Sequence, residues 1–154
     1  MKITWHGHAC FSITHDGYTV VIDPYNADYT AGYPKLHLKA DKLLISHEHY
    51  GHNCREAVTL SGRPESDCPF EISTLEVSHD SVCGIMRGMC LIHILEVDGL
   101  KAVHMGDVGT QLHSGLAVQQ GRLARKTRLL RRSTDPGKQR SRKADRTGTG
   151  TFQE

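Results

Sequence analysis

The sequence lacks long apolar segments and paired cysteines. No stretch approaches the roughly 20 apolar residues that a membrane helix needs, and the first residues, Met1 to His6, contain no apolar core of a signal peptide. The five cysteines include no C-x-x-C pair, which argues against a zinc ribbon and against a secreted disulfide framework. We therefore expect a soluble cytoplasmic protein with reduced thiols and no membrane partner.

Aromatic residues are scarce as well, at 6% of the 154 residues, and the length is that of one ordinary domain. The net charge of +2 hides a strong asymmetry. Residues 1–110 hold 8 Lys and Arg against 14 Asp and Glu, whereas residues 111–154 hold 11 against 3. Ten of the 11 histidines lie in the acidic part, and histidine is the commonest metal ligand in proteins. The acidic part is therefore where metal chemistry is expected.

Short β-prone segments alternate with turn signals through most of the acidic part. The predicted strands cover residues 2–5, 10–14, 18–22, 42–46, 70–78, 90–97 and 100–105. Asp16-Gly17 and Asp98-Gly99 each predict a tight hairpin turn. Residues 24–40 are expected to form a loop, and Asn53 is expected to cap a short helix that ends near Leu60.

Three histidines stand close together directly after the predicted strand 42–46. Residues i and i+2 leave an extended chain on the same side, so His47 and His49 can bind one ion, and His52 can project beside them from the following turn. The pattern is not the metalloprotease motif H-E-x-x-H, because Gly51 stands where the second histidine would be. The alternative interpretation is a polar surface loop that is rich in histidine.

Two further residues are candidate metal ligands because each follows a predicted strand. A zinc ion takes about four nitrogen, sulfur or oxygen ligands, so the cluster needs donors from elsewhere in the chain. His79 follows strand 70–78 and Asp107 follows strand 100–105, which would place both at the same sheet edge. Taken alone, His79 is compatible with an ordinary hydrogen-bonded histidine and Asp107 with a turn aspartate.

The order of these residues resembles that of the metallo-β-lactamase superfamily, whose first motif is H-x-H-x-D-H. Stretches similar to its cytoplasmic, lactonase-like branch of small metal-dependent hydrolases are Thr4 to Ala9, Ile22-Asp23-Pro24, His79-Asp80, Arg87-Gly88, Glu96 to Gly99 and Gly106-Asp107. The resemblance covers about residues 1–112. It implies the α/β (α+β) class, as the N-terminal half of an αββα sandwich with a metal site at one edge of the β layers.

The resemblance also implies an activity and a set of functional residues. In such hydrolases a metal-activated water attacks an ester, amide, lactone or phosphodiester. The implied metal ligands are His47, His49, His52, His79 and Asp107, of which Asp107 and His52 are also implied as catalytic residues. The implied cofactor is a divalent ion, with zinc expected before manganese, iron or nickel.

Asp23 and His8 are expected close behind these ligands. Asp23, before Pro24, resembles a residue that supports the metal-binding loop through hydrogen bonds, with a simple strand-ending turn as the alternative. His8 is expected to line the edge of the active site, with a structural, hydrogen-bonded histidine as the alternative.

Two departures from the family pattern bear on activity. Gly51 stands where the family motif has an aspartate, so a ligand of a second metal and a water-orienting carboxylate are missing. The family's later histidine has no counterpart either, because His113 is the only histidine after Asp107 and comes too soon. We therefore expect one bound ion rather than two, and an impaired hydrolase.

The strand patterns stop near Gln111, and residues 113–154 do not supply the second half that the resemblance implies. A basic helix over residues 112–131 is conceivable, although Gly115 and Gly121 interrupt it. Residues 1–112 are therefore expected to form the metal-binding domain, and residues 113–154 a poorly ordered basic tail.

Three interpretations of the basic tail remain open. It is a segment that binds nucleic acid through Lys and Arg, a solvated extension, or an out-of-frame or degraded continuation of a truncated relative. The first of these gives the alternative function, a non-catalytic metal-binding module whose tail binds nucleic acid. The sequence leaves the small-molecule substrate and any oligomer undetermined.

Overall fold

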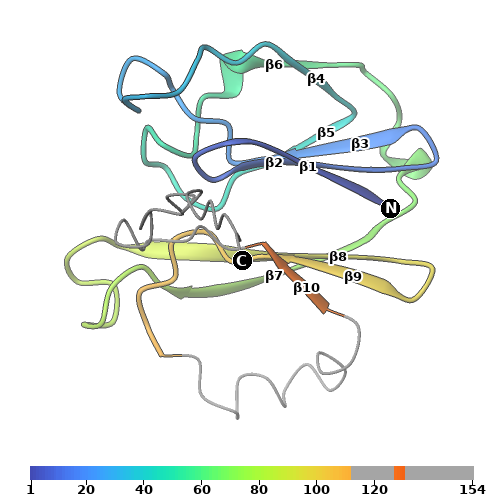
Figure 1. Cartoon of the computed structure of the whole chain (residues 1–154). Helices are drawn as coiled ribbons and strands as arrows, with labels where there is room; N and C mark the ends of the chain where they lie inside the picture. The colour runs from blue at the N-terminus through green and yellow to red at the C-terminus, as the bar shows by residue number, and fades with distance from the viewer. Residues whose placement is uncertain (112–126, 131–154) are drawn as a thin grey trace, which may run out of the picture.

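Two four-stranded sheets form the body of the molecule (Figure 1). The computed structural model describes residues 1–111 and 127–130. The strands are β1 (Lys2–Gly7), β2 (Cys10–His15), β3 (Tyr18–Ile22), β4 (Leu38–Ala40), β5 (Lys42–Leu44), β6 (Val58–Leu60), β7 (Glu71–Ser78), β8 (Met89–Val97), β9 (Leu100–His104) and β10 (Thr127–Leu130). The first sheet has the order β1-β2-β3-β5 and the second has the order β10-β9-β8-β7, while β4 and β6 form a separate pair.

The predicted hairpins are confirmed. Strands β2 and β3 pair antiparallel, and the connecting residues Asp16 and Gly17 take φ values of +47° and +75°. Strands β8 and β9 are joined in the same way by Asp98 and Gly99, at +50° and +68°. Positive φ at both central residues of a two-residue turn matches the twist of the flanking strands, which is why Asp-Gly predicted these turns.

The main core lies between the two sheets. Side chains of β3 alternate, so Tyr18, Val20 and Ile22 belong to this core while Val21 belongs to a cluster on the opposite face. The buried residues of the main core are Ile13, Tyr18, Val20, Ile22, Phe70, Leu95, Val97 and Ala102. A further cluster packs on the other face of the second sheet, formed by Val77, Cys90, Ile92, Ile94 and Val103. Buried side chains therefore lie on both faces of each sheet.

The outer face of the first sheet is covered by the β4–β6 pair (Figure 1). Cys10 and Val21 of the sheet pack there with Ala40 of β4 and Val58 of β6. The two β layers of the expected sandwich are thus present. The part of the chain that the structure describes is strand-rich and contains only two short 3-10 helices, Arg55–Ala57 and Glu65–Asp67, so the expected α layers are not found within it.

The predicted helix from Asn53 to Leu60 is wrong. A single 3-10 turn, Arg55–Ala57, is followed at once by β6, which pairs parallel with β4 inside the segment expected to be a loop. The side chain of Asn53 donates to Glu48 at 3.1 Å instead of capping a helix. Val58 is buried and β-branched, so pairing in an extended strand outweighs the weak capping signal.

The basic tail enters the described structure only at β10. This strand pairs parallel with β9. At residues 127–130, the prediction that strands stop near Gln111 is therefore wrong, and so is the helix considered for residues 112–131. Backbone pairing with the free edge of β9 outweighs the helical leucine pattern, which two glycines interrupt. The remaining tail residues, and with them the three interpretations of the tail, lie outside the described residues.

No helix in the described residues has the length and apolar character needed to cross a membrane. All five cysteines fall within these residues, and none of them is in a disulfide there.

Candidate metal centre

The segments that carry the predicted ligands end at one edge of the sheets. Strands β7 and β9 both pair antiparallel with β8, so they run in the same direction and end at the same edge. His79 directly follows β7, and Asp107 follows β9 after a two-residue connection. The loop that contains His47 is tied to the same place, because the Leu91 N–H of β8 donates to the Ser46 carbonyl at 2.8 Å.

All five predicted ligands are brought together in two overlapping sets. The first set is His47, His49 and His79, and the second is His47, His52 and Asp107. Within each set the ligand atoms lie within 4.8 Å of one another. Ligands at about 2.0–2.2 Å from one ion stand at most about 4.4 Å apart, so small side-chain rotations suffice for coordination.

The buried nitrogen atoms of the first set fit a cation. Among the described residues, His47 Nε2 and both ring nitrogens of His79 are buried without a hydrogen-bond partner. Leaving such an atom unsatisfied costs about 1–3 kcal/mol, which a metal ion offsets by accepting its lone pair. Burial, with a smaller contribution from His52 and His79, lowers the pKa of His47 to about 4, so its imidazole is in the neutral form that metals bind.

Asp23 contacts the loop that contains His47 and is completely buried. Its carboxylate accepts hydrogen bonds from the Ser46 N–H at 2.6 Å and the Ser46 hydroxyl at 2.5 Å, and pairs with His52 Nδ1 at 2.9 Å. Burial raises the pKa of Asp23, but the hydrogen bond to His52 and the charges of His104 and His52 outweigh burial and lower it. Asp23 therefore contacts the metal-binding loop as the resemblance implied, and its effect on metal binding stays a prediction.

His52 stands between two carboxylates. Its Nδ1 faces Asp23, and its Nε2 lies 3.3 Å from Asp107 Oδ2. Burial lowers the pKa of His52, but the two carboxylates outweigh that effect and raise it to about 9. The hydrogen bond to His52 in turn holds the pKa of Asp107 far below its usual range. Asp23 thus fixes the orientation of the His52 ring toward Asp107.

Comparison with known proteins shows the family to which the chain belongs. The sequence model of the Beta-lactamase superfamily domain matches residues 2–124, which is most of the chain. The chain belongs to the metallo-β-lactamase superfamily. The match extends past residue 112, where the resemblance seen in the sequence motifs ended.

Individual relatives in the superfamily are longer than this chain. Two UPF0173 metal-dependent hydrolases, from Thermoplasma volcanium and Thermoplasma acidophilum, are 43% and 28% identical to it over 77% of its length. That match is 45% of each relative, so the chain spans about half the length of the curated relatives it matches. A solved structure named as a metal-dependent hydrolase, from Parabacteroides distasonis, has a TM-score of 0.51 and 24% identity, and the match covers 69% of this chain and 60% of that chain. This likeness shows a shared fold.

Ser46 is a member of the site that the motif analysis did not single out. Its hydroxyl contacts Asp23 Oδ2 and lies 2.9 Å from His47 Nδ1, so it joins the Asp23 carboxylate to one of the candidate metal ligands. The available signal was its place, directly before the first histidine of the superfamily motif. Glu48, inside the motif, faces away, because Arg55 binds both of its carboxylate oxygens, at 2.5 and 3.0 Å.

His8 lies where the superfamily motif places a side chain that this chain lacks. Its ring is 5.2 Å from the His52 ring, centroid to centroid, and stacks at 6.1 Å on Tyr33. A Cβ atom added to Gly51 would lie 2.4 Å from His8 Nε2. His8 is thus at the edge of the histidine cluster, as expected, although it belongs to neither ligand set.

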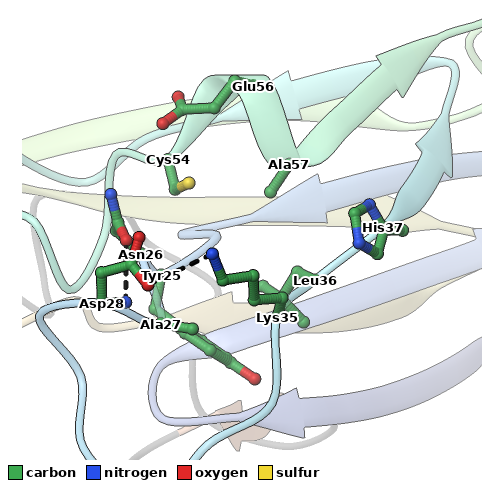
Figure 2. A pocket seen from close by; sticks show the side chains of 10 residues that line it. All are labelled: Tyr25, Asn26, Ala27, Asp28, Lys35, Leu36, His37, Cys54, Glu56 and Ala57. Carbon is green, nitrogen blue, oxygen red and sulfur yellow. Dashed lines mark hydrogen bonds and ion pairs between the residues drawn. The ribbon is translucent and has the colours of Figure 1, made fainter.

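A separate pocket of about 180 Å³ lies beside the segment that follows the motif (Figure 2). Asp28 and Lys35 face each other in an ion pair of 3.3 Å at this pocket, and Cys54, Glu56 and Ala57 line its other side. None of the five predicted ligands lines it, so this pocket is distinct from the histidine cluster.

Proposed function

We propose that this chain is the metal-binding part of a metal-dependent hydrolase and that its histidine cluster holds one divalent ion, with zinc the first choice. The observation that carries the proposal is the set His47, His49 and His79, whose ligand atoms lie within 4.8 Å of one another. In this set His49 is exposed, whereas His47 Nε2 and both ring nitrogens of His79 are buried without a hydrogen-bond partner among the described residues. Manganese, iron and nickel suit the same nitrogen and oxygen donors, so elemental analysis must identify the metal.

In the proposed reaction, His47, His49 and His79 would hold the ion, and Asp107 and His52 would act on the attacking water. A bound divalent cation would supply Lewis acidity to a substrate ester, amide, lactone or phosphodiester and would acidify water. Asp107 Oδ2 lies 3.3 Å from His52 Nε2 and 3.7 Å from His79 Nε2, at the junction of the two sets. We assign to this oxygen the orientation of the attacking water, from which it would accept a hydrogen bond, with His52 holding the carboxylate in place.

Gly51 is the reason to expect slow turnover. The superfamily carboxylate at this position would bind metal and orient water, and loss of such a positioned group commonly lowers a rate by about 10²–10⁴. The first ligand set does not include residue 51, so metal binding there does not depend on the missing carboxylate.

Hydrolysis of a simple lactone and of bis(4-nitrophenyl) phosphate, with zinc or manganese supplied, tests the proposed activity. We expect a slow rate that disappears with a chelator and falls by about 10²-fold or more in Asp107→Ala. The control His37→Ala, which changes an exposed histidine outside the cluster, should keep the full rate. A rate that survives chelation would contradict metal dependence. No rate in the metal-loaded chain would contradict hydrolysis and leave a metal-binding module.

A further inference from the structure

The connection between β7 and β8 starts at a candidate metal ligand and is held in shape by one carboxylate. It begins with His79 and projects past the ends of both strands (Figure 1). The Asp80 carboxylate accepts four backbone N–H groups at 2.8 to 3.0 Å, those of Val82, Gly84, Met86 and Arg87. The His79 N–H donates to the Gly88 carbonyl at 3.0 Å, which closes the connection at its base. Residues 80–88, the Asp80 loop, are therefore fixed in position relative to His79.

The Asp80 loop holds apolar side chains away from the core. Ile85 and Met86 are 84% and 80% exposed, more than any other large apolar side chain of the described residues. Val82 and Met89, on either side of them in the sequence, are exposed as well. Single exposed apolar residues are ordinary, but a group of them is typical of a binding surface. The hydrogen bonds of Asp80 keep this surface in one shape.

A cation lies in the same loop. Residues 1–111 contain three arginines, of which Arg55 and Arg63 each pair with a carboxylate. The third, Arg87, forms no ion pair within the described part of the chain, and its own loop offers only the Asp80 carboxylate, which is bound to backbone N–H groups. Burial and the neighbouring histidines lower the pKa of His49, and the charge of Arg87 lowers it further. An unpaired cation within electrostatic reach of a candidate metal ligand attracts a negatively charged group.

We propose that the Asp80 loop is the substrate-recognition loop of the metal centre and selects substrates in which an apolar chain is joined to a negatively charged group. Ile85 and Met86 contact the chain, and Arg87 attracts the charge. This inference rests on the proposed function and narrows its substrate class. A second copy of this chain or a lipid surface would also cover the apolar side chains. The attachment of the loop to His79 favours a substrate, because it keeps these side chains at a constant place beside the metal centre.

The first test compares binding of butyrate and octanoate to the zinc-loaded chain by calorimetry. Octanoate should bind at least about tenfold more tightly, because each methylene removed from water strengthens binding by up to about fourfold. Ile85→Ser with Met86→Ser should bring octanoate close to the affinity of butyrate and leave butyrate unchanged. The control Leu60→Ser with Leu100→Ser, which removes two exposed apolar side chains outside the loop, should keep the difference. Equal affinities for the two carboxylates in the unmodified chain, or the same difference in both double variants, would overturn the proposal.

The second test separates the charge from the chain. Arg87→Gln should weaken butyrate and octanoate by the same factor, about tenfold, whereas the control Arg63→Gln should weaken neither. Unchanged affinities in Arg87→Gln would contradict the role of the cation. Zinc content is measured in each variant. An unmodified chain without zinc would contradict the proposed function and this inference with it, whereas a zinc-loaded chain without chain-length preference would contradict this inference alone.

The third test asks whether a different partner covers the loop. The unmodified chain and Ile85→Ser with Met86→Ser should have the same mass by light scattering, and neither should sediment with vesicles of anionic phospholipid. A dimer that the double variant loses would show that the loop is an interface between copies. Vesicle binding that the double variant loses would show a membrane-binding loop. Either result would overturn recognition of a small substrate.

Discussion

At the scale of single residues, the carboxylate of Asp23 contacts both the segment before His47 and the ring of His52. It is buried, it binds both the N–H and the hydroxyl of Ser46, and it fixes the Nδ1 side of His52. Asp41 makes a similar pair of contacts at a distance from the cluster, with the Thr19 N–H at 2.7 Å and the Ser61 hydroxyl at 2.6 Å. The two aspartates therefore form a matched pair for mutation.

Asp23→Asn should lower zinc affinity by about 10–100-fold, the usual effect of losing a group that orients a metal ligand. An amide keeps only one acceptor oxygen, so either Ser46 or His52 would face an N–H₂ group. Titration of the metal-free protein with zinc measures the change. Asp41→Asn should reduce stability without changing zinc affinity. Equal affinity losses in the two variants would show that Asp23 acts on the fold and not on the metal centre.

The residue scale is also where sequence reasoning was incomplete. That the five candidate ligands lie close together could be predicted, because each stands just after a strand or within one short motif, and strand ends that share an edge come together. The closeness of His8 to position 51 could not be predicted, because it joins two turns that are far apart in the sequence. Nor could the hydrogen bonds of Ser46, since a serine before a histidine has no fixed partner.

At the scale of elements, most strands of the two sheets were predictable because their residues alternate, and Asp-Gly turns join β2 to β3 and β8 to β9. Strand β10 was not predicted. The segment 53–60 was not predictable, because its capping signal was local whereas the pairing of β6 with β4 is made across the fold. The connection after β9 is the element on which Asp107 depends. The Gly109 N–H donates to the Ser78 carbonyl at 3.1 Å, which anchors this connection to the end of β7.

Gly109→Ala should disturb that anchor, because an added Cβ would lie 2.1 Å from the His79 carbonyl oxygen. We expect a loss of about 1–3 kcal/mol in the free energy of unfolding, as for other overpacked positions, together with weaker zinc binding. Gly99→Ala is the control. It has a φ of +68° with open space around it, so it should cost about 1 kcal/mol and leave zinc affinity unchanged. Denaturant unfolding and zinc titration measure both effects, and full zinc affinity in Gly109→Ala would contradict this account of the connection.

At the scale of the whole molecule, the proposed metal centre joins the two sheets. His47 and His49 follow the last strand of the first sheet, and His79 follows an edge strand of the second. A metal ion that binds only the folded arrangement stabilises the protein by linkage. Metal binding and the association of the two sheets would therefore be thermodynamically coupled. The described residues contain the complete first ligand set, although the chain spans about half the length of its curated relatives.

The metal content of the purified chain after dialysis tests the central claim most directly. The account predicts about one divalent ion per chain, loss of that ion in the double variant His47→Ala with His49→Ala, and retention of it in His37→Ala. An unmodified chain without a bound ion, or a double variant that keeps as much metal as the unmodified chain, would contradict the assignment of His47, His49 and His79 as a metal site.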